Sequence, residues 1–207
     1  MNALNLAESL KTIKKYGIHT TEFWEATDEK QALFAAQQTG FPAAMKIVST
    51  KINHKSDAGA VKLNLKNAEE TTRAFSELSK LEGFEGVIVQ PMVFGTEIII
   101  GGKQDEQFGP TILFGLGGIF VEVFKDYSIR ICPITKKDAK EMIAEIKGLP
   151  LLLGARGRPK ANLAEIENTL LKVSKMLLKE KQIRELDINP LMATPDGVTA
   201  VDARIIL

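Results

Sequence analysis

The 207-residue sequence predicts an α+β fold. Apolar runs as long as a strand alternate with segments whose apolar residues recur every three or four positions, as they do along one face of a helix. Hydrophobic residues make up 44% of the chain, which is enough for a substantial core. A chain of this length can form one domain or two small lobes.

Helices are expected where a capping residue precedes an apolar periodicity. At four places an Asp, Asn or Thr stands three residues before a Gln, Glu or Asp, which is typical of a helix N-terminus. The four pairs are Asp28 with Gln31, Asn67 with Glu70, Thr135 with Asp138, and Asn162 with Glu165. A further amphipathic helix is expected over residues 3–16.

Strands are expected at the apolar runs between these helices, namely 43–48, 60–65, 87–93, 96–101 and 111–114. Asp126, Ser128 and Arg130 alternate with apolar residues, so these three polar side chains should share one face of another strand. The chain is expected to end in two strands joined at Pro195-Asp196-Gly197. Because proline cannot donate to a ladder, Pro91 suits an edge or a hinge, and the elements before it make a compact α+β lobe.

Composition excludes several classes of protein. The 27 basic residues against 26 acidic ones argue against a dedicated nucleic-acid binder. No apolar run approaches the roughly 20 residues that span a bilayer, and no secretory signal is visible, so no membrane association is expected. The single cysteine, Cys132, excludes an internal disulfide. We therefore expect an intracellular, cytoplasmic protein.

A basic loop between the strands 43–48 and 60–65 is the first candidate for chemistry. It contains Lys51, His54, Lys55, Ser56 and Asp57, and its donors could cover the phosphates of a nucleotide. His54 could act as a nucleophile or carry a phosphoryl group. The alternative is an ordinary hairpin with a solvated loop.

Lone polar residues within apolar strands are the second set of candidates. Lys46 could contact phosphate oxygens, or it could extend to solvent from an edge position. Glu97 could accept hydrogen bonds from ribose hydroxyls, or it could be a solvated strand residue.

The final pair of strands carries a cluster of oxygen ligands. Asp187 and Asn189 share a strand face, and counting from the turn places Asp202 nearly opposite Asn189. Such hard oxygen ligands are what Mg²⁺ prefers, with a nucleotide phosphate completing its shell. The polar face of a half-exposed hairpin is the alternative.

Six motifs together resemble the ATP-grasp part of ADP-forming acyl-CoA synthetases, most closely the separate beta subunit of the two-subunit enzymes. They are residues 40–49, 52–61, 89–92, 107–110, 114–122, and 186–191 with 201–204. The sequence differs from the usual pattern at Ala60, where a second glycine is usual, and at His19, where a proline is usual. The resemblance runs from about Leu4 to Ile205.

The resemblance implies a two-lobed ATP-grasp fold with nucleotide bound between the lobes. We expect residues 1–92 to form the smaller lobe, with the N-terminal helix, and residues 93–207 the larger. It implies an acid–CoA ligase that runs acyl-CoA + ADP + phosphate ⇌ carboxylic acid + CoA + ATP with Mg²⁺. A CoA-binding alpha subunit would complete a hetero-oligomer.

The resemblance also implies roles for individual residues. His54 falls on the phosphoryl-carrying histidine. From the spacing alone, Asp57, three residues after His54, could orient its ring. Lys46 falls on a phosphate-binding lysine, and Arg130 on a second phosphate contact. The nucleotide would be held at Gln90, Pro91, Met92 and Val93, and the metal by Asp187, Asn189 and Asp202.

Two other functions remain open from the sequence. The chain could be an ATP-grasp module cut from a longer fusion, such as an acetyltransferase. It could also be a non-catalytic nucleotide-sensing subunit. The sequence gives neither the acyl substrate nor the preference between adenine and guanine.

Overall fold

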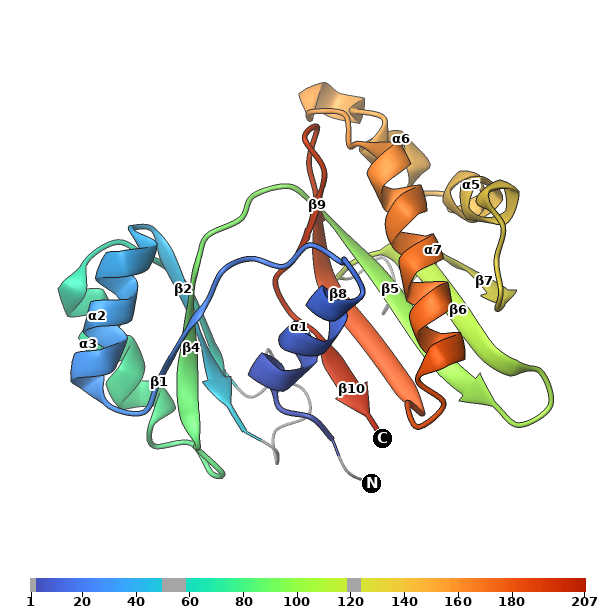
Figure 1. Cartoon of the computed structure of the whole chain (residues 1–207). Coiled ribbons are helices and arrows are strands. Elements are labelled where there is room, and N and C mark those ends of the chain that lie inside the picture. Colours follow the sequence, from blue (N-terminus) through green and yellow to red (C-terminus); the bar gives the residue numbers. More distant parts are fainter. Residues whose placement is uncertain (1–2, 50–58, 119–123) are drawn as a thin grey trace. The chain divides into compact units, whose positions relative to one another are not determined.

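The computed structural model describes residues 3–49, 59–118 and 124–207, and it confirms the α+β class (Figure 1). The chain divides into two compact units. The smaller unit comprises residues 5–7 and 21–93, and the larger comprises residues 1–4, 8–20 and 94–207. Among the described residues, no helix is both long enough and apolar enough to cross a bilayer.

The smaller unit is a four-stranded antiparallel sheet with two helices on one face (Figure 1). The strand order is β1-β4-β2-β3. The strands are β1 (Trp24–Ala26), β2 (Ala43–Val48), β3 (Val61–Leu65) and β4 (Gly86–Pro91), and the helices are α2 (Glu29–Thr39) and α3 (Ala68–Leu78). Met45, Val87 and Val89 from the sheet are buried in one core with Ala32 and Leu78 from the helices.

The larger unit is built on a six-stranded antiparallel sheet in the order β10-β8-β5-β6-β7, with β9 paired to β8. The strands are β5 (Thr96–Asp105), β6 (Gly109–Leu116), β7 (Tyr127–Ile131), β8 (Glu185–Ala193), β9 (Val198–Ala200) and β10 (Arg204–Ile206). Strands β5 and β6 are longer than expected because they form a continuous hairpin ladder from Ile98 opposite Leu116 to Asp105 opposite Gly109.

Three helices and a 3₁₀ turn that follow β7 in the chain pack on one face of this sheet. They are α5 (Lys136–Glu145), the short α6 (Leu149–Leu152) and 3₁₀ turn η1 (Ala155–Gly157), and the long α7 (Leu163–Lys179). α7 approaches β5 so closely that a Cβ on Gly102 would lie 2.6 Å from Cδ1 of Leu177. Glycine at this position therefore allows the helix to lie against the strand.

All four predicted N-caps are confirmed. The side chains of Asp28, Asn67, Thr135 and Asn162 each accept a hydrogen bond from the backbone N–H three residues on. At Thr135 the Asp138 carboxylate also accepts from the Thr135 backbone, which completes a capping box. These caps satisfy backbone donors that a helix N-terminus would otherwise leave unpaired.

The N-terminal helix α1 (Leu6–Lys15) groups mostly with the larger unit, whereas the sequence analysis placed it with residues 1–92. Backbone pairing on both sides of the helix accounts for this difference. The Leu4 N–H donates to the Ile205 carbonyl at 2.9 Å, and the His19 carbonyl accepts from the Ala200 N–H at 2.9 Å.

Candidate functional site

Lys46 and Gln90 lie on the face of the small sheet that is turned away from α2 and α3. Their strand neighbours Met45 and Val89 are in the core beneath the helices, so alternation directs Lys46 and Gln90 to the other face. Lys46 lies opposite Ile88 in the register, which makes Lys46 and Gln90 diagonal neighbours. Lys46 is only 4% exposed and Gln90 only 1%. The edge-strand interpretation of Lys46 is wrong, because β2 lies between β3 and β4.

The carboxamide of Gln90 is a buried polar group without a partner in the described part of the chain. Neither Oε1 nor Nε2 has a hydrogen-bond partner there. Leaving a buried donor or acceptor unpaired costs about 1–3 kcal/mol, so native proteins rarely do so without a functional reason.

Gln90 also begins the segment that leads out of the smaller unit. Pro91 is the last residue of β4 and Val93 the last residue of the unit. The Met92 N–H donates to the carbonyl of Pro42 at 3.2 Å. Since that donor is engaged, the predicted backbone contacts to a base would have to come from the groups that flank the Met92 N–H.

His54 and Asp57 lie outside the described residues, as does the rest of the loop 50–58. The ends of the loop are nevertheless well defined. The Ile47 N–H donates to the Ala60 carbonyl at 3.0 Å, and Lys46 is paired with Val61. The loop therefore leaves and rejoins the sheet directly beyond Lys46.

In the larger unit, Glu97 is exposed on β5 and stands against the turn that follows β6. The Gly117 N–H donates to the Glu97 carbonyl at 2.9 Å, and a Cβ on Gly117 would lie 3.0 Å from the Cβ of Glu97. Any side chain at Gly117 would press on Glu97. Glycine at this position therefore allows the turn to lie close to β5.

The second arm of the predicted terminal hairpin is broken into two short strands, and the register supports the expected meeting of Asn189 and Asp202. β9 pairs Ala200 with Leu191, and β10 pairs Arg204 with Asp187, so one register continues across the break at 201–203. In this register Asn189 lies opposite Asp202. The Val201 N–H donates to the Pro190 carbonyl at 3.3 Å and holds the two segments together across the break.

This donor set fits Mg²⁺, which is bound through one or two carboxylates and completes its shell with water and phosphate. Asp187 and Asn189 share a face of β8, and Asp202 lies across from it. In the described ranges no three His, Cys, Asp or Glu residues gather in a way that could hold a metal. The candidate set has only two carboxylates and one amide oxygen, so a metal held there would need the nucleotide phosphates and water to complete its shell. The role of these residues as ligands remains a prediction.

The polar face of β7 is confirmed, and it is turned toward the helices. The Asp126 carboxylate accepts from the backbone N–H groups of Lys147 and Gly148, both at 2.7 Å, and the Ser128 hydroxyl donates to the Met142 carbonyl at 2.9 Å. Arg130 forms a two-pronged hydrogen-bonded ion pair with Glu145 of α5. This pairing lowers the pKa of Glu145. A phosphate contact by Arg130, still a prediction, would have to compete with Glu145.

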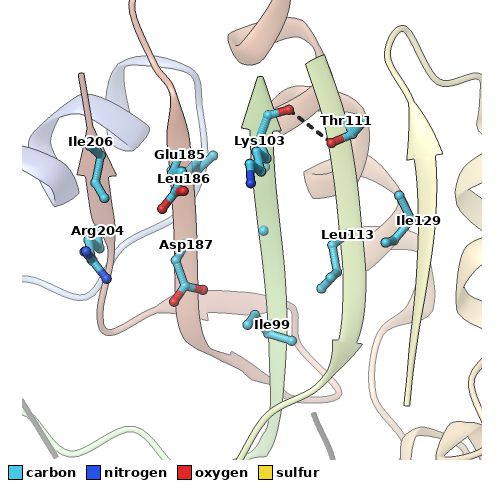
Figure 2. A pocket seen from close by; sticks show the side chains of 12 residues that line it. Ile99, Lys103, Thr111, Leu113, Ile129, Glu185, Leu186, Asp187, Arg204 and Ile206 are labelled. Atoms are coloured by element: carbon cyan, nitrogen blue, oxygen red, sulfur yellow. Dashed lines mark hydrogen bonds between the residues drawn. The ribbon is translucent and has the colours of Figure 1, made fainter. Parts of the chain in front are cut away.

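The opposite face of the large sheet is hollowed by a cavity of about 350 Å³ (Figure 2). Its lining combines apolar side chains with charged ones that the sequence analysis did not propose as site residues, namely Lys103, Glu185 and Arg204. Arg204 lies directly opposite the candidate ligand Asp187. Strand alternation could have identified Arg204, because it follows Asp202 by two positions.

A family model and individual relatives both match nearly the whole of this chain. Residues 1–207 match the model of the ATP-grasp domain family. The chain is 46% identical to the beta subunit of acetate–CoA ligase (ADP-forming) I of Pyrococcus furiosus, over 97% of this chain and 90% of that one. It is 42% identical to acetate–CoA ligase (ADP-forming) I of Archaeoglobus fulgidus over 97% of this chain but only 30% of that one.

A solved structure covers the whole chain. It is acetyl-coenzyme A synthetase 1 of Candidatus Korarchaeum cryptofilum, in complex with coenzyme A and Mg-AMPPCP. Its phosphohistidine segment points towards the nucleotide-binding site. The TM-score is 0.86 and the identity 39%, over 100% of this chain and 93% of that one.

Proposed function

This chain belongs to the ATP-grasp domain family and, within it, to the beta subunits of ADP-forming acetate–CoA ligases, and we propose that it transfers a phosphoryl group from a histidine to ADP. The overall reaction is acyl-CoA + ADP + phosphate ⇌ carboxylic acid + CoA + ATP. The observation that carries the proposal is the position of Lys46, buried on the sheet face that is turned away from α2 and α3, at the base of the loop that contains His54.

His54 is the phosphoryl carrier in this proposal. The bond between the phosphorus and the imidazole nitrogen breaks, a bond to a terminal oxygen of ADP forms, and the freed ring nitrogen takes up one proton from solvent, which leaves neutral histidine and ATP. Lys46 neutralises phosphate charge during the transfer, and such neutralisation and positioning account for most catalysis in phosphoryl transfer. Asp57 orients the ring of His54, as carboxylates orient other functional imidazoles.

Mg²⁺ supplies further charge neutralisation when it is bound with the nucleotide, and Asp187, Asn189 and Asp202 would hold it. The magnesium-bound nucleotide analogue in the Korarchaeum synthetase supports this assignment. Gln90 to Val93, with Glu97, would hold the base and ribose.

A second polypeptide supplies the acyl-CoA chemistry in this proposal. The Pyrococcus relative of nearly equal length is a beta subunit, and the Archaeoglobus relative is more than three times the length of the matched region. We propose a CoA-binding alpha subunit as the partner. The Archaeoglobus relative also favours a second candidate, in which the chain is the ATP-grasp module of a single fused ligase.

Reconstitution tests the proposal. The purified chain should bind ADP in a calorimeter but form no ATP from acetyl-CoA, ADP and phosphate, because the acyl-CoA step belongs to the partner. Adding a purified alpha subunit should start ATP formation. Turnover by the chain alone would contradict the subunit assignment, and failure to bind ADP would contradict the nucleotide role itself.

A further inference from the structure

The cavity on the large sheet contains a cation that the proposed function does not use, Arg204. Its Nε is buried and has no hydrogen-bond partner among the residues that the structure describes. A guanidinium carries five N–H donors and no acceptor, so only an acceptor can complete its hydrogen bonds. A buried donor without a partner costs folding free energy, and one that borders a cavity therefore indicates an anionic ligand.

Two other cations of the larger unit are less suited to holding such a ligand. Lys103 lines the same cavity, but it lies directly opposite Glu185 in the register, so a carboxylate already stands across from it. Arg130 lies on the face that the helices cover and is paired with Glu145 of α5. The anion role expected of Arg130 therefore fits Arg204 better, because Arg204 faces the cavity.

The proposed nucleotide contacts of the larger unit follow one another along the sheet. Glu97, the proposed ribose contact, lies opposite Met192 near one end of the ladder between β5 and β8. Gly101, four residues further along β5, lies opposite Asp187. Glu97 and Gly101 share a face by alternation, and Gly101 lines the cavity. The cavity thus lies beyond Glu97 in the direction of the proposed metal ligands.

Arg204 lies at the far end of this row. It is directly opposite Asp187 and two residues beyond Asp202, and Figure 2 shows Arg204 and Asp187 on neighbouring strands. A nucleotide with its ribose at Glu97 and its phosphates on the metal would direct its terminal phosphate toward Arg204. That end of ADP receives the phosphoryl group from the histidine. Arg204 therefore lies where the group is transferred, beyond the contacts that hold ADP itself.

We propose that the Arg204 guanidinium donates hydrogen bonds to the oxygens of the phosphoryl group as it passes from His54 to ADP. The inference rests on the proposed transfer function and adds a catalytic residue to it. A planar guanidinium can hold two phosphoryl oxygens at once. An arginine that contacts the transferred group accelerates related reactions about 10³–10⁵-fold. No bond forms to Arg204, so the bonds that break and form are those of the proposed function.

Two nucleotides test the contact in the purified chain with Mg²⁺: ADP, and the ATP analogue AMPPCP, which adds a terminal group at the transfer position. Arg204→Met should weaken AMPPCP binding about tenfold or more, because a charge-assisted contact is lost, and should leave ADP affinity within about twofold of the parent. Calorimetry measures both affinities. An unchanged ratio of the two affinities would overturn the proposal, as would an equal loss for both nucleotides or a parent that binds ADP but not AMPPCP. Failure of the parent to bind ADP would instead count against the proposed function.

Two further variants complete the test. Arg204→Lys keeps the charge but not the two-pronged geometry, so its ratio of affinities should lie between those of the parent and Arg204→Met. Arg204→Lys also carries the test if Arg204→Met fails to fold, and a ratio equal to that of the parent would then overturn the proposal. Arg184→Met, at an exposed position just before β8, is the matched control. A loss of AMPPCP affinity in this control as large as in Arg204→Met would reduce the effect to general electrostatics and overturn the contact.

Kinetics of the reconstituted enzyme separate transfer from binding. At saturating ADP, Arg204→Met should turn over about a hundredfold more slowly or less, with a nearly unchanged KM for ADP, because the guanidinium acts on the group in transit. A residue that only oriented Asp187 would instead raise the Mg²⁺ concentration needed for ADP binding. That result, with an unchanged ratio of ADP to AMPPCP affinity, would make Arg204 a positioning residue and overturn the proposal.

Discussion

The hydroxyl of Tyr16, just beyond α1, donates a hydrogen bond to the Glu180 carboxylate at the C-terminal end of α7. The Lys179 ammonium lies 5.7 Å from the centre of the same ring. Residues far apart in sequence are thereby joined within the larger unit. The bond to Glu180 is the main cause that raises the pKa of Tyr16 to about 12, and it also lowers the pKa of Glu180.

Tyr16→Phe should lower the free energy of unfolding by about 1 kcal/mol at neutral pH, because it removes one partly exposed hydrogen bond to a charged group. The raised pKa stabilises the fold fully below the ordinary tyrosine value of 10.0, and this contribution is lost as the pH rises toward about 12. The Glu180 contribution is lost in the opposite direction, on acidification. Urea unfolding of parent and variant across pH measures both, and a difference that persists unchanged at about pH 12 would contradict the assignment.

Lys46→Met should weaken ADP binding about tenfold or more, since a charge-assisted contact of about 1.5–3 kcal/mol is removed. Lys62→Met is the matched control, because Lys62 on neighbouring β3 pairs with Glu77 of α3. Calorimetry with ADP should separate the two variants. Equal ADP affinity in parent and Lys46→Met would contradict a phosphate contact.

Asn189→Ala and Asp202→Ala should each raise the Mg²⁺ concentration needed for half-maximal turnover of the reconstituted enzyme. Each would remove one proposed oxygen ligand from a magnesium shell that phosphate and water only partly complete. Asp196→Ala, in the exposed turn of the same hairpin, controls for a general effect on the strands. If the magnesium titration curves of both site variants overlay the curve of the parent, the cluster is a solvated strand face and not a metal site.

His54→Ala should abolish complete turnover, with a loss of about a thousandfold or more, or about 4 kcal/mol of barrier. ADP affinity should stay nearly unchanged, because the imidazole takes part in transfer and not in holding base or ribose. His19→Ala is the matched control, since His19 is the only other histidine and pairs with β9 through its backbone carbonyl. A turnover rate of His54→Ala within tenfold of the parent rate would contradict the proposal that His54 carries the phosphoryl group.

The helix starts could be predicted because the signal that fixes them is local. A cap such as Asn67 needs only a backbone N–H three residues on, so four short patterns were sufficient. The register of the terminal strands could be predicted for a similar reason, since the turn at Pro195 lies within a few residues of Asn189 and Asp202.

The environment of β7 could not be predicted in the same way. Alternation shows that Ser128 and Arg130 share a face, but only the packing of α5 decides that this face is covered and that Ile129 is exposed on the other. The partner of Arg130, Glu145, lies fifteen residues away on a helix whose position no local pattern fixes. The lack of a hydrogen-bond partner for Gln90 among the described residues was equally hidden, because it depends on every neighbour of the side chain at once.

The pairing of Ala3 and Leu4 with Ile206 and Ile205 brings both ends of the described chain to one edge of one sheet. A second polypeptide can be spliced to either end there without disturbing the strand order, and circular permutation is favoured by the same adjacency. This is consistent with the family containing both a separate subunit matched over 90% of its length and a ligase matched over 30%.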